Sequence, residues 1–119
     1  MGRRKILVVD DDRNVLETLK LVLEEKYEVI TATNGEEAVQ LYKSHKPDVV
    51  LMDIIMPVMN GVDATREIKK YDPDAKIIGV TAYARTHRNI LLKAGALEIV
   101  EKPFRRRVLL ETIEKYLQK

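Results

Sequence analysis

The amino-acid sequence predicts a three-layer α/β sandwich in which five parallel strands alternate with five helices. Short apolar runs rich in β-branched residues, typical of strands buried on both faces, alternate with segments whose apolar residues recur at helical spacing. Because right-handed crossovers put helices on both faces of a parallel sheet, this alternation predicts a helix layer on each side. The 119 residues suit a single domain over 1–119.

The elements follow one another in a regular order. The expected strands are the apolar runs at residues 6–9, 29–30, 49–52, 77–80 and 99–100. Helical spacing of apolar residues follows each strand in turn. These positions are Val15, Leu19, Val22 and Leu23; Ala38, Val39 and Tyr42; Val62, Ala64 and Ile68; Ile90, Leu91 and Ala94; and Val108, Leu109, Ile113, Tyr116 and Leu117.

Residues that begin or end helices lie at the expected boundaries. Asp12 and Asn34 are suited to cap the first and second helices, because their side chains can accept hydrogen bonds from free backbone N–H groups. Pro47 and Pro73 separate helices from the strands that follow, and Gly95 closes the fourth helix. The boundaries therefore agree with the apolar periodicity.

Composition excludes several classes of protein. The chain has 21 basic and 19 acidic residues, a balance too even to favour direct nucleic-acid binding, although residues 105–107 are three consecutive arginines. It has no cysteine for a disulfide or a thiolate metal site. No apolar stretch approaches the ~18 residues needed to cross a bilayer. We expect no membrane insertion and a cytoplasmic location.

Polar side chains follow four of the expected strands. Asp10 and Asp11 come directly after the first strand, Asp53 after the third, Thr81 after the fourth and Lys102 after the fifth. The carboxyl ends of parallel strands meet at one edge of the sheet, which is where α/β proteins bind their ligands. We therefore expect these side chains to converge there.

The neighbouring carboxylates indicate a metal ion. Two carboxylates ~4 Å apart repel each other by roughly 4 kcal/mol at an effective dielectric constant of about 20. A divalent cation removes this repulsion, and a small set of hard oxygen ligands suits Mg²⁺, with Mn²⁺ as a substitute. The sequence therefore predicts a magnesium site at this edge.

Five separated motifs resemble the receiver domain of two-component response regulators, in particular the stand-alone chemotaxis regulators. They are residues 9–11 (VDD), 51–57 (LMDIIMP), 60–61 (NG), 80–82 (VTA) and 101–104 (EKPF). The resemblance covers essentially the whole chain. It implies the flavodoxin-like (βα)5 fold with strand order 2-1-3-4-5, the order for which the chemotaxis regulator is a standard example.

The resemblance also implies a role for each acid. Asp53 is expected to accept a phosphoryl group from the phosphohistidine of a sensor histidine kinase or a phosphotransfer protein. Asp11, Asp53 and the main-chain carbonyl of Ile55 would bind the metal directly, and Asp10 would act mostly through bound water. Thr81 and Lys102 would contact the phosphoryl oxygens. Such a chain catalyses its own phosphorylation and dephosphorylation, so it is not a conventional enzyme.

In the family, phosphorylation changes a protein-docking face made by the fourth helix, the fifth strand and the fifth helix, which an unidentified downstream protein would recognise. The resemblance assigns switch roles to Thr81 and to Ile99, at a position that is commonly Tyr or Phe. Gly61 is expected to adopt a positive φ before the third helix, and the bond before Pro103 is expected to be cis.

Two other functions remain open on the sequence alone. One is a receiver-like docking module that works without phosphorylation, although none of the expected site residues is missing. The other is a flavodoxin-type cofactor carrier or a small phosphohydrolase, although the acidic turn at residues 10–14 offers no cradle for an anion. The chain ends directly after the fifth expected helix, which leaves open whether the domain acts alone or within a longer regulator.

Overall fold

The computed structural model describes residues 2–118 and contains one parallel five-stranded sheet in the order β2-β1-β3-β4-β5. This confirms the predicted fold class and strand order. The strands are Lys5–Val9 (β1), Glu28–Ala32 (β2), Val49–Met52 (β3), Ile77–Thr81 (β4) and Glu98–Glu101 (β5). β2 lies on one side of β1, and β3, β4 and β5 follow one another on the other side. β1 and β3 are therefore neighbours, although α1, β2 and α2 separate them in the chain.

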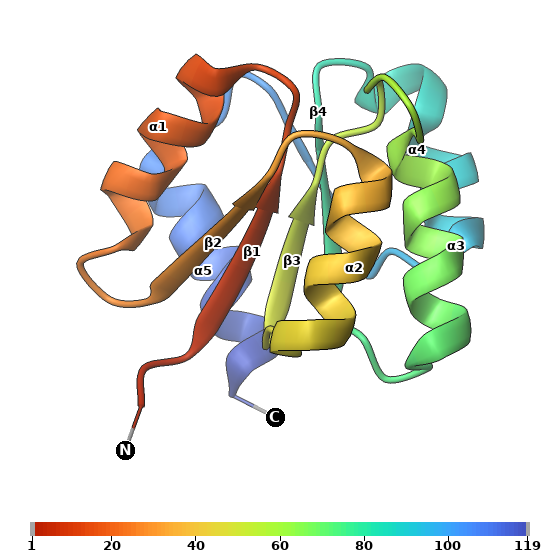
Figure 1. Ribbon diagram of the computed structural model, residues 1–119. Helices are drawn as coiled ribbons and strands as arrows, with labels where there is room; N and C mark the ends of the chain where they lie inside the picture. The colour runs from red at the N-terminus through yellow and green to blue at the C-terminus, as the bar shows by residue number, and fades with distance from the viewer. Residues whose placement is uncertain (1, 119) are drawn as a thin grey trace.

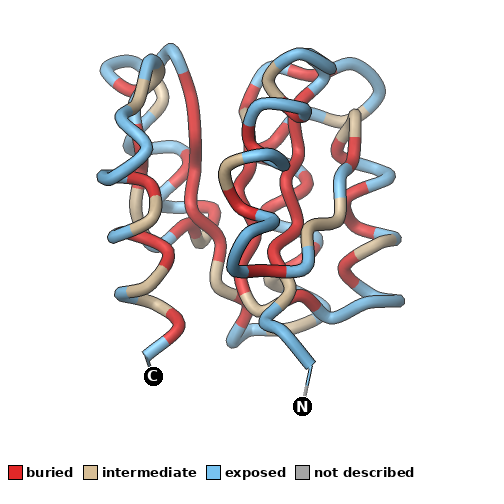
Figure 2. Tube along the Cα trace, turned by 90° about the vertical axis from the view of Figure 1, so that its left-hand side faces the viewer, coloured by how far each residue is buried: buried red, intermediate tan, exposed pale blue. Residues whose placement is uncertain are grey.

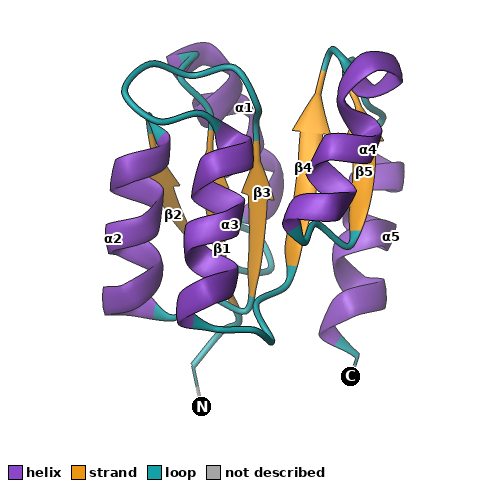
Figure 3. Ribbon diagram, turned by 90° about the vertical axis from the view of Figure 1, so that its right-hand side faces the viewer, coloured by secondary structure: helices purple, strands orange, loops and turns teal. Residues whose placement is uncertain are grey.

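Within residues 2–118, five helices cover the two faces of the sheet. They are Arg13–Leu23 (α1), Gly35–His45 (α2), Gly61–Tyr71 (α3), Ala84–Ala94 (α4) and Arg106–Leu117 (α5). α1 and α5 lie on one face and α2, α3 and α4 on the other (Figure 1 and Figure 3). Among the described residues, no helix combines the length and the apolar character that a membrane span requires.

The core consists of two apolar layers, one on each side of the sheet. Successive side chains of a strand point to opposite faces, so Ile6 and Val8 pack toward α1 and α5, while Leu7 and Val9 pack toward α2 and α3. All of β3 and β4 is buried, and Figure 2 shows this buried backbone at the centre of the molecule. Burial on both faces explains why the strands read as continuous apolar runs.

Side-chain caps fix where the helices next to the site begin. Asp12 accepts a hydrogen bond from the N–H of Asn14 (2.9 Å), and Asn34 accepts one from the N–H of Glu37 (2.8 Å), as predicted. Asn60 caps α3 in the same way, accepting from the N–H of Asp63 (2.9 Å). These bonds satisfy N–H groups that the first helical turn leaves free.

The prediction of a positive φ at Gly61 is wrong. Among the described glycines, the one with a positive φ is Gly95, with φ of 121°, at the end of α4. Gly61 is required for a different reason: a Cβ there would lie 1.8 Å from the main-chain oxygen of Asp53. The N–H of Gly61 donates to the carbonyl of Ile54 (2.7 Å), so the start of α3 lies directly against the end of β3. The sequence could not distinguish close backbone approach from a left-handed conformation.

The Lys102–Pro103 peptide bond is cis, as expected.

Candidate functional site

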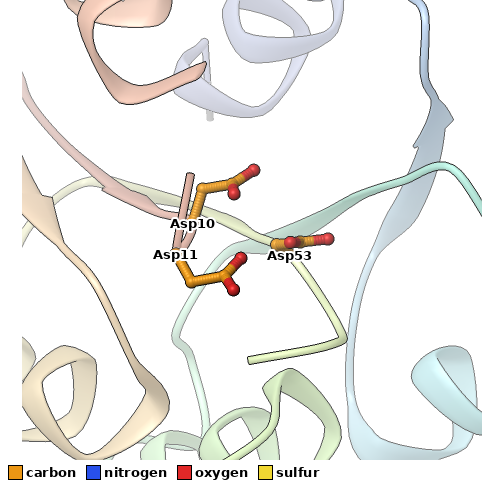
Figure 4. A group of neighbouring side chains, drawn as sticks. All are labelled: Asp10, Asp11 and Asp53. Carbon is orange, nitrogen blue, oxygen red and sulfur yellow. The ribbon is translucent and has the colours of Figure 1, made fainter. Parts of the chain in front are cut away.

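Three carboxylates meet at the carboxyl edge of the sheet. β1 and β3 are paired, with Val9 opposite Met52, and the N–H of Asp53 continues the ladder by donating to the carbonyl of Val9 (3.0 Å). One carboxylate oxygen from each of Asp10, Asp11 and Asp53 lies within 4.8 Å of the other two. Figure 4 shows the three side chains directed toward one shared space. The predicted convergence of acids from the first and third strands is therefore present.

The three acids differ in burial and in the hydrogen bonds that orient them. Asp10 is buried, Asp53 is largely covered and Asp11 is exposed. Oδ1 of Asp10 accepts from the N–H of Asp12 (2.9 Å), and Oδ1 of Asp53 accepts from the N–H of Ile54 (2.9 Å). These bonds fix the direction of each carboxylate, but one neutral N–H donor does not offset a full negative charge in a covered site.

Lys102 supplies the cation of the cluster. Its main-chain N–H donates to the carbonyl of Thr81 (2.8 Å), which carries the β4–β5 pairing one residue further. Its Nζ lies 2.6 Å from Oδ2 of Asp10 and 3.6 Å from Oδ1 of Asp53. Burial alone would lower the pKa of this ammonium, but the hydrogen bond that it donates to Asp10 and the charges of Asp53 and Asp10 raise the pKa above its usual value.

The environment of Asp53 disfavours its negative charge. Burial, followed by the charge of Asp10, raises the pKa of Asp53 to about 6, although Lys102 and the N–H of Ile54 act in the opposite direction. One lysine therefore does not neutralise the cluster. Additional positive charge at this position would lower the pKa and stabilise the ionised carboxylate.

Thr81 and Ile55 occupy the margin of the same edge. Thr81 is the last residue of β4 and is completely buried, and its Oγ1 accepts a hydrogen bond from the N–H of Tyr83 (2.9 Å). Ile55 follows Asp53 by two residues and exposes its side chain to solvent. The interaction between the Tyr83 N–H and the Thr81 hydroxyl was not anticipated, because a backbone donor leaves no signal in residue types.

The remaining predicted switch residue, Ile99, lies outside the carboxylate cluster. It pairs with Gly79 in the β4–β5 ladder and is 7% exposed. Its neighbours in the apolar cluster include Leu91, on the buried side of α4. A Cβ on Gly79 would lie 2.9 Å from Cδ1 of Ile99 and 2.8 Å from Cδ1 of Leu91, so Ile99 already fills the space over that glycine.

The donor set fits a hard divalent cation. Among the described residues, the carboxylates of Asp10, Asp11 and Asp53 form the one group of potential metal ligands, and it contains no imidazole. Oxygen ligands of this kind suit Mg²⁺, which usually binds proteins through one or two carboxylates and keeps several waters. The single lysine leaves part of the negative charge of the cluster unneutralised, and this charge also favours binding of a cation.

A family model described as the response regulator receiver domain matches residues 6–114. The chain is 47% identical to the chemotaxis protein CheY of Thermotoga maritima over 118 residues, which cover 97% of this chain and 98% of that protein. It resembles the response regulator protein TrrA of Thermotoga maritima in complex with Mg²⁺ and BeF, with TM-score 0.88, 44% identity and coverage of 96% and 99%.

A further similar structure is a CheY-like response regulator receiver domain protein from Methanospirillum hungatei. Its TM-score is 0.92 at 35% identity, covering 98% of this chain and 95% of that one.

Proposed function

Because the chain belongs to the response regulator receiver domain family, we propose that it works by accepting a phosphoryl group on Asp53 in a two-component signalling pathway. The observation that carries this proposal is the cluster of Asp10, Asp11 and Asp53, with carboxylate oxygens within 4.8 Å of one another and the Lys102 ammonium beside them. The domain extends over residues 1–119 as a single unit.

In this proposal Asp11, Asp53 and the main-chain carbonyl of Ile55 would hold Mg²⁺ directly, and Asp10 would hold it mostly through bound water. Mn²⁺ would replace Mg²⁺ because both accept carboxylate and carbonyl oxygens. When bound, the ion opposes the negative charge that builds on the phosphoryl oxygens during transfer. Support comes from the oxygen-only donor set and from the similarity to a receiver whose structure contains Mg²⁺.

The reaction is a phosphoryl transfer to a carboxylate. An oxygen of Asp53 attacks phosphorus, and the bond from phosphorus to the donor atom breaks with its electron pair remaining on the donor. A phosphohistidine of a sensor histidine kinase or phosphotransfer protein serves as the donor. Later attack of water on phosphorus breaks the bond to the Asp53 oxygen, which releases inorganic phosphate and returns the free carboxylate. The chain thus assists its own phosphorylation and dephosphorylation and turns over no separate substrate.

Two side chains stabilise the phosphoryl group. Lys102 leaves Asp10 and pairs with a phosphoryl oxygen as a compact positive charge. The Thr81 hydroxyl donates to a second oxygen. Since its oxygen accepts from the N–H of Tyr83 (2.9 Å), its hydrogen is free to be donated elsewhere, which supports this role.

The output passes from Thr81 to the face formed by α4, β5 and α5, where a downstream protein docks. Thr81 pairs with Glu101 on β5, and Ile99 lies two residues earlier on that strand beneath α4. β5 is also tied to α5, because the carboxylate of Glu98 accepts from the Tyr116 hydroxyl (2.8 Å). A shift of Thr81 toward a phosphoryl group therefore has a packed route to the docking face.

Replacing Asp53 tests the proposal directly. The parent and Asp53→Asn are treated with acetyl phosphate and Mg²⁺ and then weighed by intact-protein mass spectrometry. We expect the parent to gain one phosphoryl group and Asp53→Asn to gain none. Asp12→Asn is the matched control, because it removes an adjacent acid while keeping a capping residue. Equal labelling of Asp53→Asn and the parent would refute the assignment of the acceptor.

A further inference from the structure

An apolar pocket lies immediately beside the proposed phosphoryl site. Its volume is about 490 Å³, and it is formed between α1 and the segment that follows β5. The residues that carry the argument are Val15 and Leu19 of α1, Ala82 after β4, and Lys102, Pro103 and Phe104. This volume falls within the range of small-molecule sites, roughly 300–1,000 Å³.

One residue, Lys102, belongs both to the wall of this pocket and to the surroundings of the acceptor carboxylate. Lys102 lines the pocket, and its Nζ is 3.6 Å from Oδ1 of Asp53. Ala82 also lines the pocket and directly follows Thr81. A group attached to a phosphoryl moiety at Asp53 therefore has the pocket within reach.

The chemistry of the walls defines what the pocket accepts. Phe104, Pro103, Val15 and Leu19 offer apolar surface, and Lys102 is the one charged residue of the lining. No acid lines it. An open apolar groove with a single cation at the side of the carboxylates suits a flat apolar ring joined to an anionic phosphate.

We propose that this pocket is a leaving-group subsite, which takes the aromatic body of a phosphodonor while its phosphoryl group reaches Asp53. The inference rests on the proposed function and adds small aryl-bearing donors to the phosphohistidine donor named there. The probe is benzoyl phosphate. An oxygen of Asp53 attacks phosphorus, the bond from phosphorus to the benzoyl oxygen breaks, and benzoate departs with the electron pair. Benzoate is a weak base, so no proton is needed.

An aromatic donor then reacts faster than a small one of the same chemistry. Acetyl phosphate has the same acyl phosphate group but only a methyl group to place in the pocket. Covering an aromatic ring with apolar surface favours the benzoyl donor by about ten- to hundredfold in the second-order rate constant. The ratio of the two rate constants isolates the subsite, because Mg²⁺ and the reacting atoms are common to both donors.

Two tryptophan variants on α1 provide the test and its control. Thr18 lines the pocket, so Thr18→Trp fills it, whereas Glu17 faces a separate hollow with Arg13 and Lys20. Both positions are exposed on the helix, so the substitutions are matched in size and setting. We expect the benzoyl-to-acetyl ratio to fall close to one in Thr18→Trp and to stay at the parent value in Glu17→Trp.

A binding measurement without metal or turnover keeps the inference falsifiable if either variant folds poorly. Benzoate is titrated into ¹⁵N-labelled parent protein, and we expect amide shifts concentrated at Val15, Thr18 and Phe104. A parent ratio near one, an unchanged ratio in Thr18→Trp, or no shift at these amides would overturn the subsite. Failure of both donors to label the parent would overturn the proposed function itself, whereas labelling by both at equal rates would overturn the subsite alone.

Discussion

The ammonium of Lys102 lies 2.6 Å from Oδ2 of Asp10, a side chain that is only 4% exposed. The two residues are 92 positions apart and follow strands β5 and β1, which are separated in the sheet by β3 and β4. The lysine is thus nearer to the buried acid than to Asp53, at 3.6 Å. Lys102 therefore neutralises a buried carboxylate in the unphosphorylated protein, before it contacts any phosphoryl group.

Lys102→Met should destabilise the protein, and Mg²⁺ should restore part of the loss. Removing the ammonium leaves Asp10 buried beside Asp53 without a cation, which we expect to lower the free energy of unfolding by about 1–3 kcal/mol. A metal at the carboxylates supplies the missing charge. Urea unfolding with and without Mg²⁺ measures both effects. The double variant Asp10→Asn with Lys102→Met should lose less than Lys102→Met alone, and an identical loss with and without Mg²⁺ would contradict this account.

Asp53→Asn should stabilise the metal-free protein above pH 6. The folded pKa of Asp53 is about 6 against a reference of 3.8, so the ionised carboxylate opposes folding when pH exceeds both values. This penalty fades as pH falls from about 6 to 4, because the folded protein takes up the proton first. The full shift corresponds to about 3 kcal/mol, and partial solvent access reduces it to about 1–2 kcal/mol.

The check is urea unfolding of both proteins in EDTA across this pH range. The difference between Asp53→Asn and the parent should be largest at pH 7–8 and close to zero below pH 4. A difference that grows toward acid would mean that the environment stabilises the ionised form.

Val58→Gly should stabilise the fold. Val58 has φ of 69°, a conformation unusual for a β-branched residue, in a three-residue turn closed by the Met59 N–H and the Pro57 carbonyl (2.7 Å). Its side chain is 77% exposed, so little apolar contact offsets the strain. Glycine relieves about 1–2 kcal/mol of strain and adds less than 1 kcal/mol of unfolded-state entropy. We expect a net gain of about 0.5–1 kcal/mol.

Thermal unfolding of Val58→Gly and Val58→Ala separates strain from side-chain loss. Alanine keeps a Cβ in the left-handed region, so it should gain less than glycine. A lower melting temperature for Val58→Gly than for the parent would show that this turn is not strained.

Ile99→Ala should cost stability without removing the phosphoryl acceptor. Ile99 is 7% exposed and packs beneath α4 against Leu91, so truncation leaves a cavity and should cost about 2–4 kcal/mol. Ile90→Ala is the control, because Ile90 is 42% exposed and should cost far less. Urea unfolding measures both, and mass spectrometry after acetyl phosphate treatment should still detect labelled Ile99→Ala. A cost below 0.5 kcal/mol for Ile99→Ala would show that the site repacks freely.

The sequence by itself determined the alternation of strands and helices, because burial on both faces of a parallel sheet and one-sided burial of helices impose different periods on apolar residues. It also determined which polar residues share an edge. Asp10, Asp53, Thr81 and Lys102 each end or follow a strand, and parallel strands end on the same side. The caps at Asp12 and Asn34 were predictable because their bonds span only two or three residues.

The tertiary structure decided what depends on distances between segments far apart in the chain. Gly61 is required by the main-chain oxygen of Asp53, Lys102 is nearest to Asp10, and the pocket beside Lys102 needs α1 and the segment after β5 to meet. Residue types record burial and local hydrogen bonding. They do not record which partner a charge approaches most closely or how much space remains between packed elements, because both follow from the sum of all contacts in the folded chain.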